Sequence, residues 1–305
     1  MKTWIALFLA AFVAGATAQS CPPCRTMKWA NCDGSPCVCP LPVSENMTQT
    51  LDCDNLIPKC FLMGAEMYRA RKGLSTRSGT KPTEDAIVDN DGIYDPICEN
   101  SGRFKAKQCN HTQECWCVNS AGVRRTDKGD VNMKCDKLVE TFWIRLQLTH
   151  LPVSGQVDAT SLKTALGSAM NARYKFDASL LQDFQYDPTA RMILADIKKP
   201  KGDRAIDLAT TAYYMEKDVK ALPLFTKQDN FTVPINGQNM LMDSILVYYV
   251  DEEPPTMTMR YLSGGIIAVI VVVVLAVVIG LLVLFFARKR LTKYNKAQQR
   301  EMEPM

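Results

Sequence analysis

The stretch QCNHTQECWCV, residues 108–118, contains the most specific pattern in the sequence. Three of its residues are cysteines, and Gly122 and a closing Cys135 follow it. On an extended segment, side chains two residues apart point to opposite sides, so Cys115 and Cys117 suit different partners. Short cysteine-dense segments fold as small modules held by disulfides, because their apolar cores are thin. The stretch therefore predicts a disulfide-stabilised module.

All twelve cysteines of the 305-residue chain lie in its first half, and the rest of the chain has none. The cysteine-free part is long enough to bury a core of its own. The cysteines form two sets of six, and an even set can close on itself in several alternative pairings. The first set spans residues 21–53 and the second residues 60–135: Cys21, Cys24, Cys32, Cys37, Cys39 and Cys53, then Cys60, Cys98, Cys109, Cys115, Cys117 and Cys135.

The two ends of the chain carry targeting signals. Residues 1–18 combine a basic start, an apolar run and a small-residue ending, which predicts a signal peptide cleaved between Ala18 and Gln19. Residues 264–286 contain no charge, and a helix of that length, at ~1.5 Å per residue, crosses a hydrocarbon core of about 30 Å. We therefore expect a single-span membrane protein in the secretory pathway.

The basic tail sets the orientation of the span. Residues 287–305 carry six basic and two acidic side chains, which accounts for the whole formal charge of +4 and leaves the exterior near neutral. Positive charge on one flank predicts a cytoplasmic tail and an extracellular N-terminus. The charge thus indicates contact with the anionic inner leaflet, not with nucleic acid. The residues expected at that leaflet are Arg288, Lys289, Arg290 and Lys293.

Three Asn-X-Ser/Thr sequons lie in the predicted exterior, at Asn46, Asn110 and Asn230, and mark candidate glycosylation sites. They agree with an N-terminus outside the cell.

CPPC, residues 21–24, admits three interpretations. Its spacing is that of a redox dithiol, of half a zinc site with Cys37 and Cys39, or of two members of a disulfide framework. A redox dithiol follows a strand and opens a helix, but only Gln19 and Ser20 precede Cys21 in the mature chain. The oxidising secretory pathway favours disulfides over zinc. We therefore expect a disulfide framework.

The sequence contains no recognisable catalytic constellation. Its two histidines are His111, inside a sequon, and His150, which we place in a turn. A Cys-His nucleophile needs an unpaired thiol, and the even cysteine count leaves none. We expect no enzymatic activity, cofactor or metal.

Residues 136–253 show the periodicities of an α+β domain. Residues 140–148, 191–198 and 244–250 predict strands, and residues 159–174 and 207–222 predict helices. The alternation of residues 140–148 places Arg145 on the face opposite Ile144 and Leu146. This order favours an antiparallel or mixed sheet with helices packed on one face. Thr160 or Ser161 is the expected N-cap of the first helix. We interpret the acidic residues 251–253 as solvated and residues 254–263 as a stalk.

A basic segment separates Cys60 from Cys98. Residues 68–85 mix arginine and lysine with Gly, Ser, Thr and Pro and lack apolar periodicity, which predicts an exposed loop. Such loops are linkers, contact surfaces or protease targets. Arg71 and Lys72 form its dibasic pair, the candidate protease site.

The motifs extend to a family resemblance. The QC and CWCV motifs with Gly122 and Cys135 resemble a thyroglobulin type-1 domain. DGIYDPICENSGRFKAKQCN, AYYMEKDVK and RKRLTKY are similar to the family of the epithelial cell adhesion molecule and the trophoblast cell-surface antigen. The resemblance covers the chain in order. It implies a signal peptide at 1–18, a six-cysteine module at 19–59, a thyroglobulin type-1 domain at 60–135, a cysteine-free α+β domain at 136–253, a stalk at 254–263, a transmembrane helix at 264–286 and a tail at 287–305.

The resemblance also implies a disulfide pairing and a function. The implied pairs are Cys21–Cys37, Cys24–Cys53, Cys32–Cys39, Cys60–Cys98, Cys109–Cys115 and Cys117–Cys135. The implied function is homophilic epithelial adhesion and signalling, through cis dimers and trans contacts, with regulated proteolysis. Claudin-family membrane proteins are implied partners, and the lateral cell surface and cell junctions are the implied location. Ala276 and Gly280, a small-xxx-small pair in the span, are the candidates for helix packing.

Two other functions remain open. Some thyroglobulin type-1 domains inhibit cysteine proteases, so a membrane-tethered inhibitor is the first alternative. An oxidoreductase at CPPC is the second.

Overall fold

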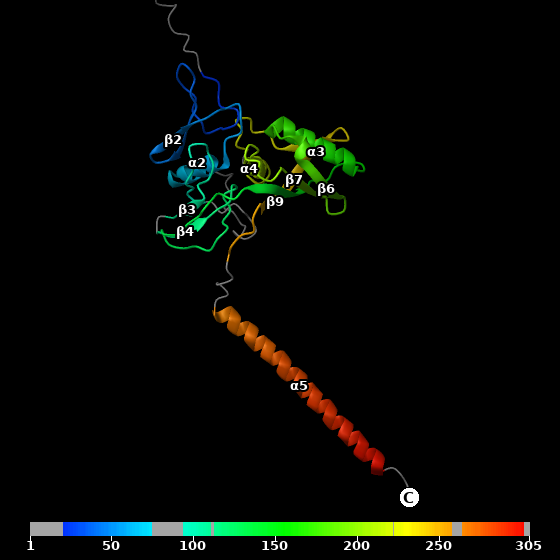
Figure 1. Cartoon of the computed structure of the whole chain (residues 1–305). Coiled ribbons are helices and arrows are strands. Elements are labelled where there is room, and N and C mark those ends of the chain that lie inside the picture. The colour runs from blue at the N-terminus through cyan, green and yellow to red at the C-terminus, as the bar shows by residue number, and fades with distance from the viewer. Residues whose placement is uncertain (1–20, 75–93, 111–112, 222, 258–263, 302–305) are drawn as a thin grey trace, which may run out of the picture. The chain divides into compact units, whose positions relative to one another are not determined.

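The structure is a computed structural model that describes residues 21–74, 94–110, 113–221, 223–257 and 264–301. The chain divides into two units, Met1–Thr256 and Met257–Met305. The first contains the disulfides and the sheet, and the second contains one long helix (Figure 1). Signal-cleavage residues Ala18 and Gln19 lie outside the described residues.

The cysteine-rich half has short elements. Strands β1 (Pro40–Ser44) and β2 (Met47–Thr50) form one hairpin, and β3 (Lys107–Cys109) and β4 (Cys115–Cys117) form another. Helix α2 (Lys59–Arg71) lies between the two hairpins in sequence. All twelve cysteines are paired, and the six disulfides are the six pairs that the family resemblance implies. The half is thus cross-linked at every cysteine.

Helix α2 changes the interpretation of the basic segment. We predicted an exposed loop from residue 68, but the helix continues through Arg71, with Lys72 as its C-cap. The N-terminal residues of α2 are buried, including Cys60 and Leu62. Packing on one side holds residues in a helix that their own weak periodicity does not predict. Residues 75–93 lie outside the described residues.

The cysteine-free half is built on a five-stranded antiparallel sheet. Its strands are β5 (Thr141–His150), β6 (Leu181–Asp187), β7 (Met192–Lys198), β8 (Thr232–Ile235) and β9 (Gln238–Asp251), in the order β6-β7-β5-β9-β8. The predicted α+β class and the three expected strands are confirmed. The edge strands β6 and β8 were missed. In β6 only Leu181 is fully buried, so the alternation of a half-buried strand is weak. Strand β8 alternates, but it has only four residues and contains Pro234.

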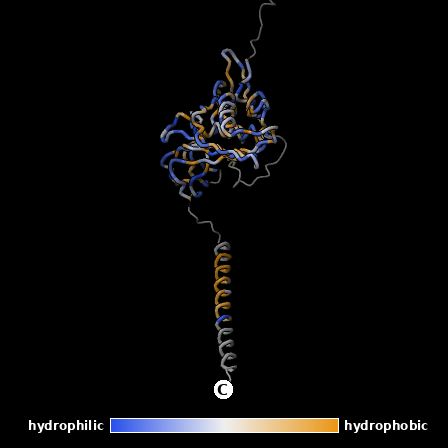
Figure 2. Tube along the Cα trace, turned by 90° about the vertical axis from the view of Figure 1, so that its right-hand side faces the viewer, coloured by the Kyte–Doolittle hydropathy of each residue, from blue (hydrophilic) through white to orange (hydrophobic). Residues whose placement is uncertain are grey.

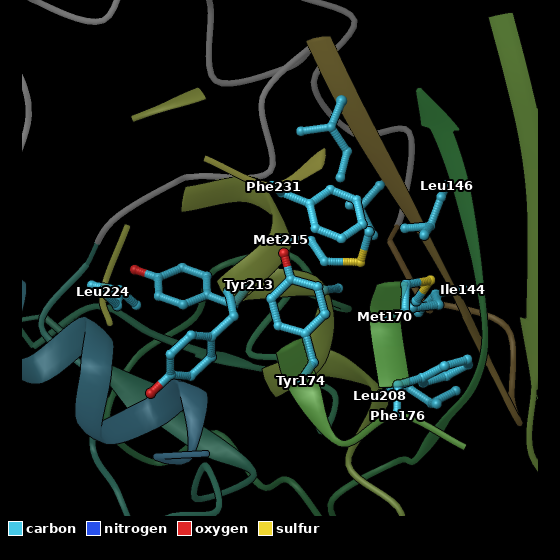
Figure 3. Packing of buried hydrophobic residues seen from close by; sticks show 14 of the residues in the cluster. Ile144, Leu146, Met170, Tyr174, Phe176, Leu208, Tyr213, Met215, Leu224 and Phe231 are labelled. Atoms are coloured by element: carbon cyan, nitrogen blue, oxygen red, sulfur yellow. The ribbon is translucent and has the colours of Figure 1, made fainter. Parts of the chain in front are cut away.

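Two helices pack against one face of this sheet. Helix α3 (Ala159–Tyr174) contacts β6 and β8, and α4 (Leu208–Lys220) contacts β5 and β9. The strand register places apolar residues opposite each other on that face, with Leu146 between Ala195 and Val247. Figure 3 shows the sheet and helix side chains meeting in one cluster that includes Ile144, Leu146, Met170, Tyr174, Phe176, Leu208, Met215 and Phe231.

Helix α4 is buried on nearly all sides, because it lies between the sheet and α2. Hydrogen bonds cross this junction: the Tyr214 hydroxyl accepts from the Ile57 N–H at 3.2 Å and donates to the Thr26 carbonyl at 2.8 Å. The buried apolar cluster runs through both halves. The two halves therefore share one core, although their sequences differ in character.

The N-cap of α3 differs from our prediction. Asp158, not Thr160 or Ser161, caps the helix, and its carboxylate accepts from the Ser161 N–H at 2.8 Å. Aspartate is as good an N-cap as serine, and the cap lies one residue before the first helical residue.

The second unit contains α5 (Gly264–Glu301), which continues past the predicted span into the predicted tail. Val269–Arg288 is long and apolar enough to cross a membrane, with a mean hydropathy of 3.6. Figure 2 shows this apolar stretch and the polar residue that ends it.

Candidate interaction site

The sheet face opposite α3 and α4 carries polar and aromatic side chains. We call Trp143, Arg145, Asp196, Lys198 and Tyr248 the open sheet face. Arg145 binds Asp196 through two parallel hydrogen bonds, of 2.6 Å from Nε to Oδ1 and 2.8 Å from Nη2 to Oδ2. Lys198 and Arg145 both lie over the Trp143 ring, at 4.5 and 5.4 Å from its centre. The ion pair and the two cation–π contacts hold these side chains in fixed positions on the strands.

The open sheet face offers both apolar area and directional charge. Tyr248 is 48% exposed; at this position β9 pairs with β5, whereas its pairing with β8 covers only residues 238–241. Hydrogen bonds from Arg145 lower the pKa of Asp196, so this carboxylate stays ionised. Exposed aromatics beside ordered ion pairs are typical of protein interfaces. The sequence placed Arg145 on the outer face by alternation but did not single out Tyr248; extending the alternation through β9 would have found it.

The stem of the basic segment is held by ion pairs. The Arg71 guanidinium binds the Asp95 carboxylate at 2.7 Å, and Lys72 Nζ lies 3.0 Å from Glu45. Asp95 raises the pKa of Arg71 through a side-chain hydrogen bond. The candidate protease site is therefore the end of a helix, fixed on both of its basic residues, and not an extended strand.

The junction between the thyroglobulin-like module and the sheet uses the residues that we interpreted as solvated. The Asp251 side chain is only 10% exposed, so that interpretation is wrong for this residue. Its carboxylate accepts from Arg125 Nε at 2.9 Å and from Asn119 and Thr141 at 2.8 Å each. Burial raises the pKa of Asp251 despite these hydrogen bonds. Three donors from separate parts of the chain thus hold this carboxylate inside the fold.

Arg125 also binds the first residues of the predicted stalk. It donates to the carbonyls of Glu253 at 2.6 Å and Pro254 at 2.8 Å, and its own carbonyl accepts from the Thr256 N–H at 2.9 Å. The start of the stalk is thus part of the folded unit, which ends at Thr256.

The three sequons have different surroundings. Asn46 and Asn230 are exposed. Asn110 is half-buried, and its side-chain amide both accepts from and donates to Glu114, at 3.0 and 3.1 Å. The described geometry therefore presents Asn46 and Asn230 more openly than Asn110 for glycosylation.

His150 does not lie in a turn. It is the last residue of β5 and is buried, with Nε2 at 3.0 Å from the Tyr186 hydroxyl and Nδ1 at 2.7 Å from the Leu151 carbonyl. Tyr186 occupies one ring nitrogen and the backbone the other, which fits a structural role. His111 lies outside the described residues.

Three cysteine sulfurs, of Cys32, Cys39 and Cys53, lie within 4.8 Å of one another. All three belong to disulfides, Cys32–Cys39 and Cys24–Cys53, so their sulfurs are not thiolate ligands.

Trp116 is buried beside the second set of disulfides and meets Tyr94 edge-on, with ring centres 5.5 Å apart.

The candidate membrane residues lie on α5. Ala276 and Gly280 are one turn apart, so both small residues lie on the same face of the helix. The side chains of Lys289, Arg290 and Lys293 lie outside the described residues, and Arg288 ends the candidate span.

These features define a class: a membrane protein whose folded unit joins disulfide-held modules to an α+β domain, with one candidate span. Comparison with known families narrows it. The family EPCAM/Trop-2, C-terminal, matches residues 141–251, and the Thyroglobulin type-1 repeat matches residues 70–136. The thyroglobulin type-1 match contains the QC and CWCV motifs, and the EPCAM/Trop-2 match contains AYYMEKDVK.

Individual relatives cover nearly the whole chain. The chain is 42% identical to the epithelial cell adhesion molecule of Homo sapiens over 308 residues, 98% of this chain and 95% of that protein. It is 38% identical to tumor-associated calcium signal transducer 2 of Homo sapiens, over 97% of this chain and 92% of that protein. The chain is 43% identical to the epithelial cell adhesion molecule of Mus musculus, over 85% of this chain and 82% of that protein. The chain belongs to this family of cell-surface proteins, and the resemblance read from the sequence is confirmed.

Proposed function

We propose that the protein is a type I membrane glycoprotein that mediates homophilic cell-cell adhesion and signalling, through cis dimers and trans contacts. The observation that carries the proposal is the open sheet face, an ordered aromatic and charged surface on the membrane-anchored folded unit. The relatives support it by their names, one an adhesion molecule and the other a signal transducer. Many weak contacts in one membrane multiply through effective concentration.

A mixed-cell aggregation assay tests adhesion with the full chain. Cells that express the protein should aggregate with one another and exclude non-expressing cells. Tyr248→Ala should reduce aggregation several-fold, because it removes exposed aromatic area from the open sheet face. Leu151→Ala, a side chain of similar exposure outside this face, is the control. Equal recruitment of non-expressing cells would contradict homophilic adhesion, and an unaffected Tyr248→Ala would exclude this face.

The family resemblance adds proteolysis in the basic segment. Cleavage at Arg71 or Lys72 requires the last turn of α2 to unwind and two ion pairs to break. The Cys60–Cys98 disulfide would hold the two products together. Limited trypsin digestion of the wild type and of Arg71→Ala/Lys72→Ala, followed by mass determination with and without reduction, locates the cut. Chemical cross-linking of the same two proteins measures the amount of dimer. If both the digestion pattern and the amount of cross-linked dimer are unchanged in the variant, Arg71 and Lys72 have no role in cleavage or in dimerisation.

The membrane helix carries the proposed contacts within the bilayer. Ala276 and Gly280 would permit close approach of a claudin-family protein or a second copy. Ala276→Leu/Gly280→Leu should reduce co-purification with claudins from epithelial membranes, and Val277→Leu is the matched control on the same helix. The proposed location is the lateral plasma membrane at cell junctions, with the basic cluster at the inner leaflet.

A second function is favoured by one specific match, that of residues 70–136 to the thyroglobulin type-1 repeat. A membrane-tethered inhibitor of cysteine proteases would bind cathepsins in a one-to-one complex. Titration of cathepsins with the purified full chain tests this. Stoichiometric inhibition without self-association would favour the inhibitor over the adhesion molecule.

A further inference from the structure

A pocket of about 490 Å³ lies where three parts of the folded unit meet. The segment before α2 contributes Asn55 and Pro58, and the thyroglobulin-like module contributes Ser101, Arg103 and Ser120. The segment before α4 contributes Arg204 and Asp207, and the lining also includes Glu140 and Lys175. The volume is within the usual range of small-ligand sites, roughly 300–1,000 Å³. The open sheet face uses none of these residues.

One carboxylate in this pocket is shared by three cations. Glu140 Oε2 accepts from Arg103 Nη2 at 2.8 Å and from Arg204 Nη1 at 2.9 Å. Glu140 Oε1 accepts from Lys199 Nζ at 2.9 Å. Because both guanidinium groups bind the same oxygen atom, they are held side by side from different parts of the fold.

The two arginines are oriented toward the solvent side of this cluster. The Lys199 side chain is 1% exposed and that of Glu140 is 6% exposed, so both are inside. The side chains of Arg103 and Arg204 are 33% and 46% exposed. Each guanidinium has five N–H donors in a rigid plane, and Glu140 occupies only part of them. Arg204 Nη1 also donates to the Leu138 carbonyl at 3.5 Å. The donors that neither Glu140 nor Leu138 occupies are available to a group that enters the pocket.

The local charge is positive. The next acidic group, Glu252, lies 3.9 Å from Arg204, at the limit of an ion pair. The Asp207 carboxylate accepts from the Thr210 N–H and hydroxyl at the start of α4. Lys175 adds another positive charge to the lining. Hydrogen bonds from Lys199 and Arg103 lower the pKa of Glu140 although its burial acts in the opposite direction, so Glu140 stays ionised and is shared by three cations.

Two other pockets of the folded unit lack this shared carboxylate. In the pocket of about 470 Å³ beside Phe225, three of the lining cations each have a carboxylate of their own: Arg25 with Asp54, Arg173 with Asp218, and Lys227 with Asp229. Lys175 lines this pocket as well and donates to the Asp54 carbonyl. In the pocket of about 290 Å³ on the sheet, Arg145 lies between Asp183 and Asp196. The shared carboxylate therefore distinguishes the three-way junction.

We propose that the pocket at this junction binds an oxyanion, the sulfate ester of a sulfated glycan, between Arg103 and Arg204. Arginine recognises sulfate, phosphate and carboxylate groups through parallel hydrogen bonds that lysine cannot match. The proposed extracellular placement makes sulfated glycans the relevant source. The hydroxyls of Ser101 and Ser120 and the amide of Asn55 line the pocket beside the arginines, where they would face sugar hydroxyls.

Titration with a heparin-derived tetrasaccharide, using the full chain in detergent micelles, tests the proposal. Arg103→Gln/Arg204→Gln should weaken binding at least ten-fold. The control Lys134→Gln/Arg191→Gln removes the same charge from two exposed positions elsewhere and should change affinity less than two-fold. Equal affinities of the two double variants would overturn the proposal, because binding would then be non-specific attraction.

Glu140→Gln provides a test in the opposite direction. The substitution keeps the shape of the side chain but removes its charge, so the pocket becomes more positive and should bind the tetrasaccharide several-fold more tightly. Sulfate should also raise the melting temperature of Glu140→Gln more than that of the wild type, compared with chloride at equal ionic strength. Unchanged or weaker binding by a folded Glu140→Gln would overturn the proposal. A protein that binds inorganic sulfate but does not bind the tetrasaccharide would overturn the glycan assignment.

Discussion

The two halves of the folded unit reach stability by different means. The cysteine-rich half has four strands of five residues or fewer, and six disulfides hold its loops. The cysteine-free half has a continuous five-stranded sheet with apolar residues on one face, covered by two helices. Disulfides act mainly by restricting the unfolded chain, whereas core burial acts on the folded state.

The boundary between the halves shows that neither is independent. Helix α2 belongs to the first half by its disulfide and to the second by its packing on α4. Glu66 of α2 is buried and accepts from Lys217 Nζ and from the Tyr213 hydroxyl of α4, each at 2.9 Å. The Cys60–Cys98 disulfide thus anchors α2, and α2 completes the core of the other half.

The largest expected effect comes from the disulfide of this shared helix. Cys60→Ser/Cys98→Ser should lower the free energy of unfolding by about 4 kcal/mol, because the bond closes a loop of 38 residues. Cys109→Ser/Cys115→Ser, which opens a loop of 6, should cost about 2 kcal/mol and is the control. Urea unfolding monitored by circular dichroism measures both. Equal losses would show that loop length does not determine the contribution.

The next effect concerns the buried ion pair at the boundary. Glu66→Ala should destabilise the protein by about 3 kcal/mol, because it leaves Lys217 buried and unpaired. Glu66→Leu/Lys217→Met replaces both charges and should recover most of the loss. Urea midpoints of the single and double variants give the result. A double variant as unstable as the single one would mean that packing, not charge, joins the halves.

A smaller effect is expected at the N-cap of α3, inside the cysteine-free half. Asp158→Ala should cost about 1 kcal/mol, because the Ser161 N–H loses its acceptor. Thr160→Ala should cost less than about 0.5 kcal/mol, since its side chain is exposed. Thermal unfolding of both variants distinguishes the caps. A larger loss at Thr160 would restore the cap expected from the sequence.

The smallest effects are pH-dependent and have opposite signs at two carboxylates of the module junction. The pKa of Glu140 is lowered, so its contribution is present above the ordinary value of 4.5 and is lost as the pH falls through the folded value. The pKa of Asp251 is raised, so its contribution is present below 3.8 and is lost as the pH rises through the folded value. Each carboxylate contributes on the order of 1 kcal/mol to the free energy of unfolding.

Unfolding free energies measured between pH 3 and pH 7 test these signs. Relative to the wild type, Glu140→Gln should lose less stability on acidification, and Asp251→Asn should lose less as the pH rises. Identical pH profiles for the wild type and both variants would show that the two carboxylates titrate alike in folded and unfolded chains.

Several elements were predictable because local pattern and tertiary environment agree. The apolar alternation of residues 140–148 matches β5, and residues 159–174 match α3 from end to end. Helix α4 was also expected, since its residues have good helical periodicity. The missed strands β6 and β8 lie at the sheet edges, where few residues are buried. Edge strands are fixed by pairing with neighbours, which a local pattern does not record.

The candidate sites divide in the same way. The open sheet face was partly predictable, because alternation assigned Arg145 outward. Asp251 was misinterpreted, because an acidic run before a stalk has the composition of solvated chain, and only its three donors from distant residues explain its burial. The Glu140 cluster gave no sequence signal, since its cations are 37, 59 and 64 residues away.

The family, the candidate span and the α+β class could be inferred from the sequence, and the signal peptide stays a prediction from it. These depend on composition, spacing and periodicity along the chain. The fold alone shows that the halves share a core, that the folded unit extends to Thr256 and that one carboxylate serves three cations. The physical reason is that burial and charge pairing are properties of neighbours in space, and the fold brings these neighbours together from distant parts of the chain.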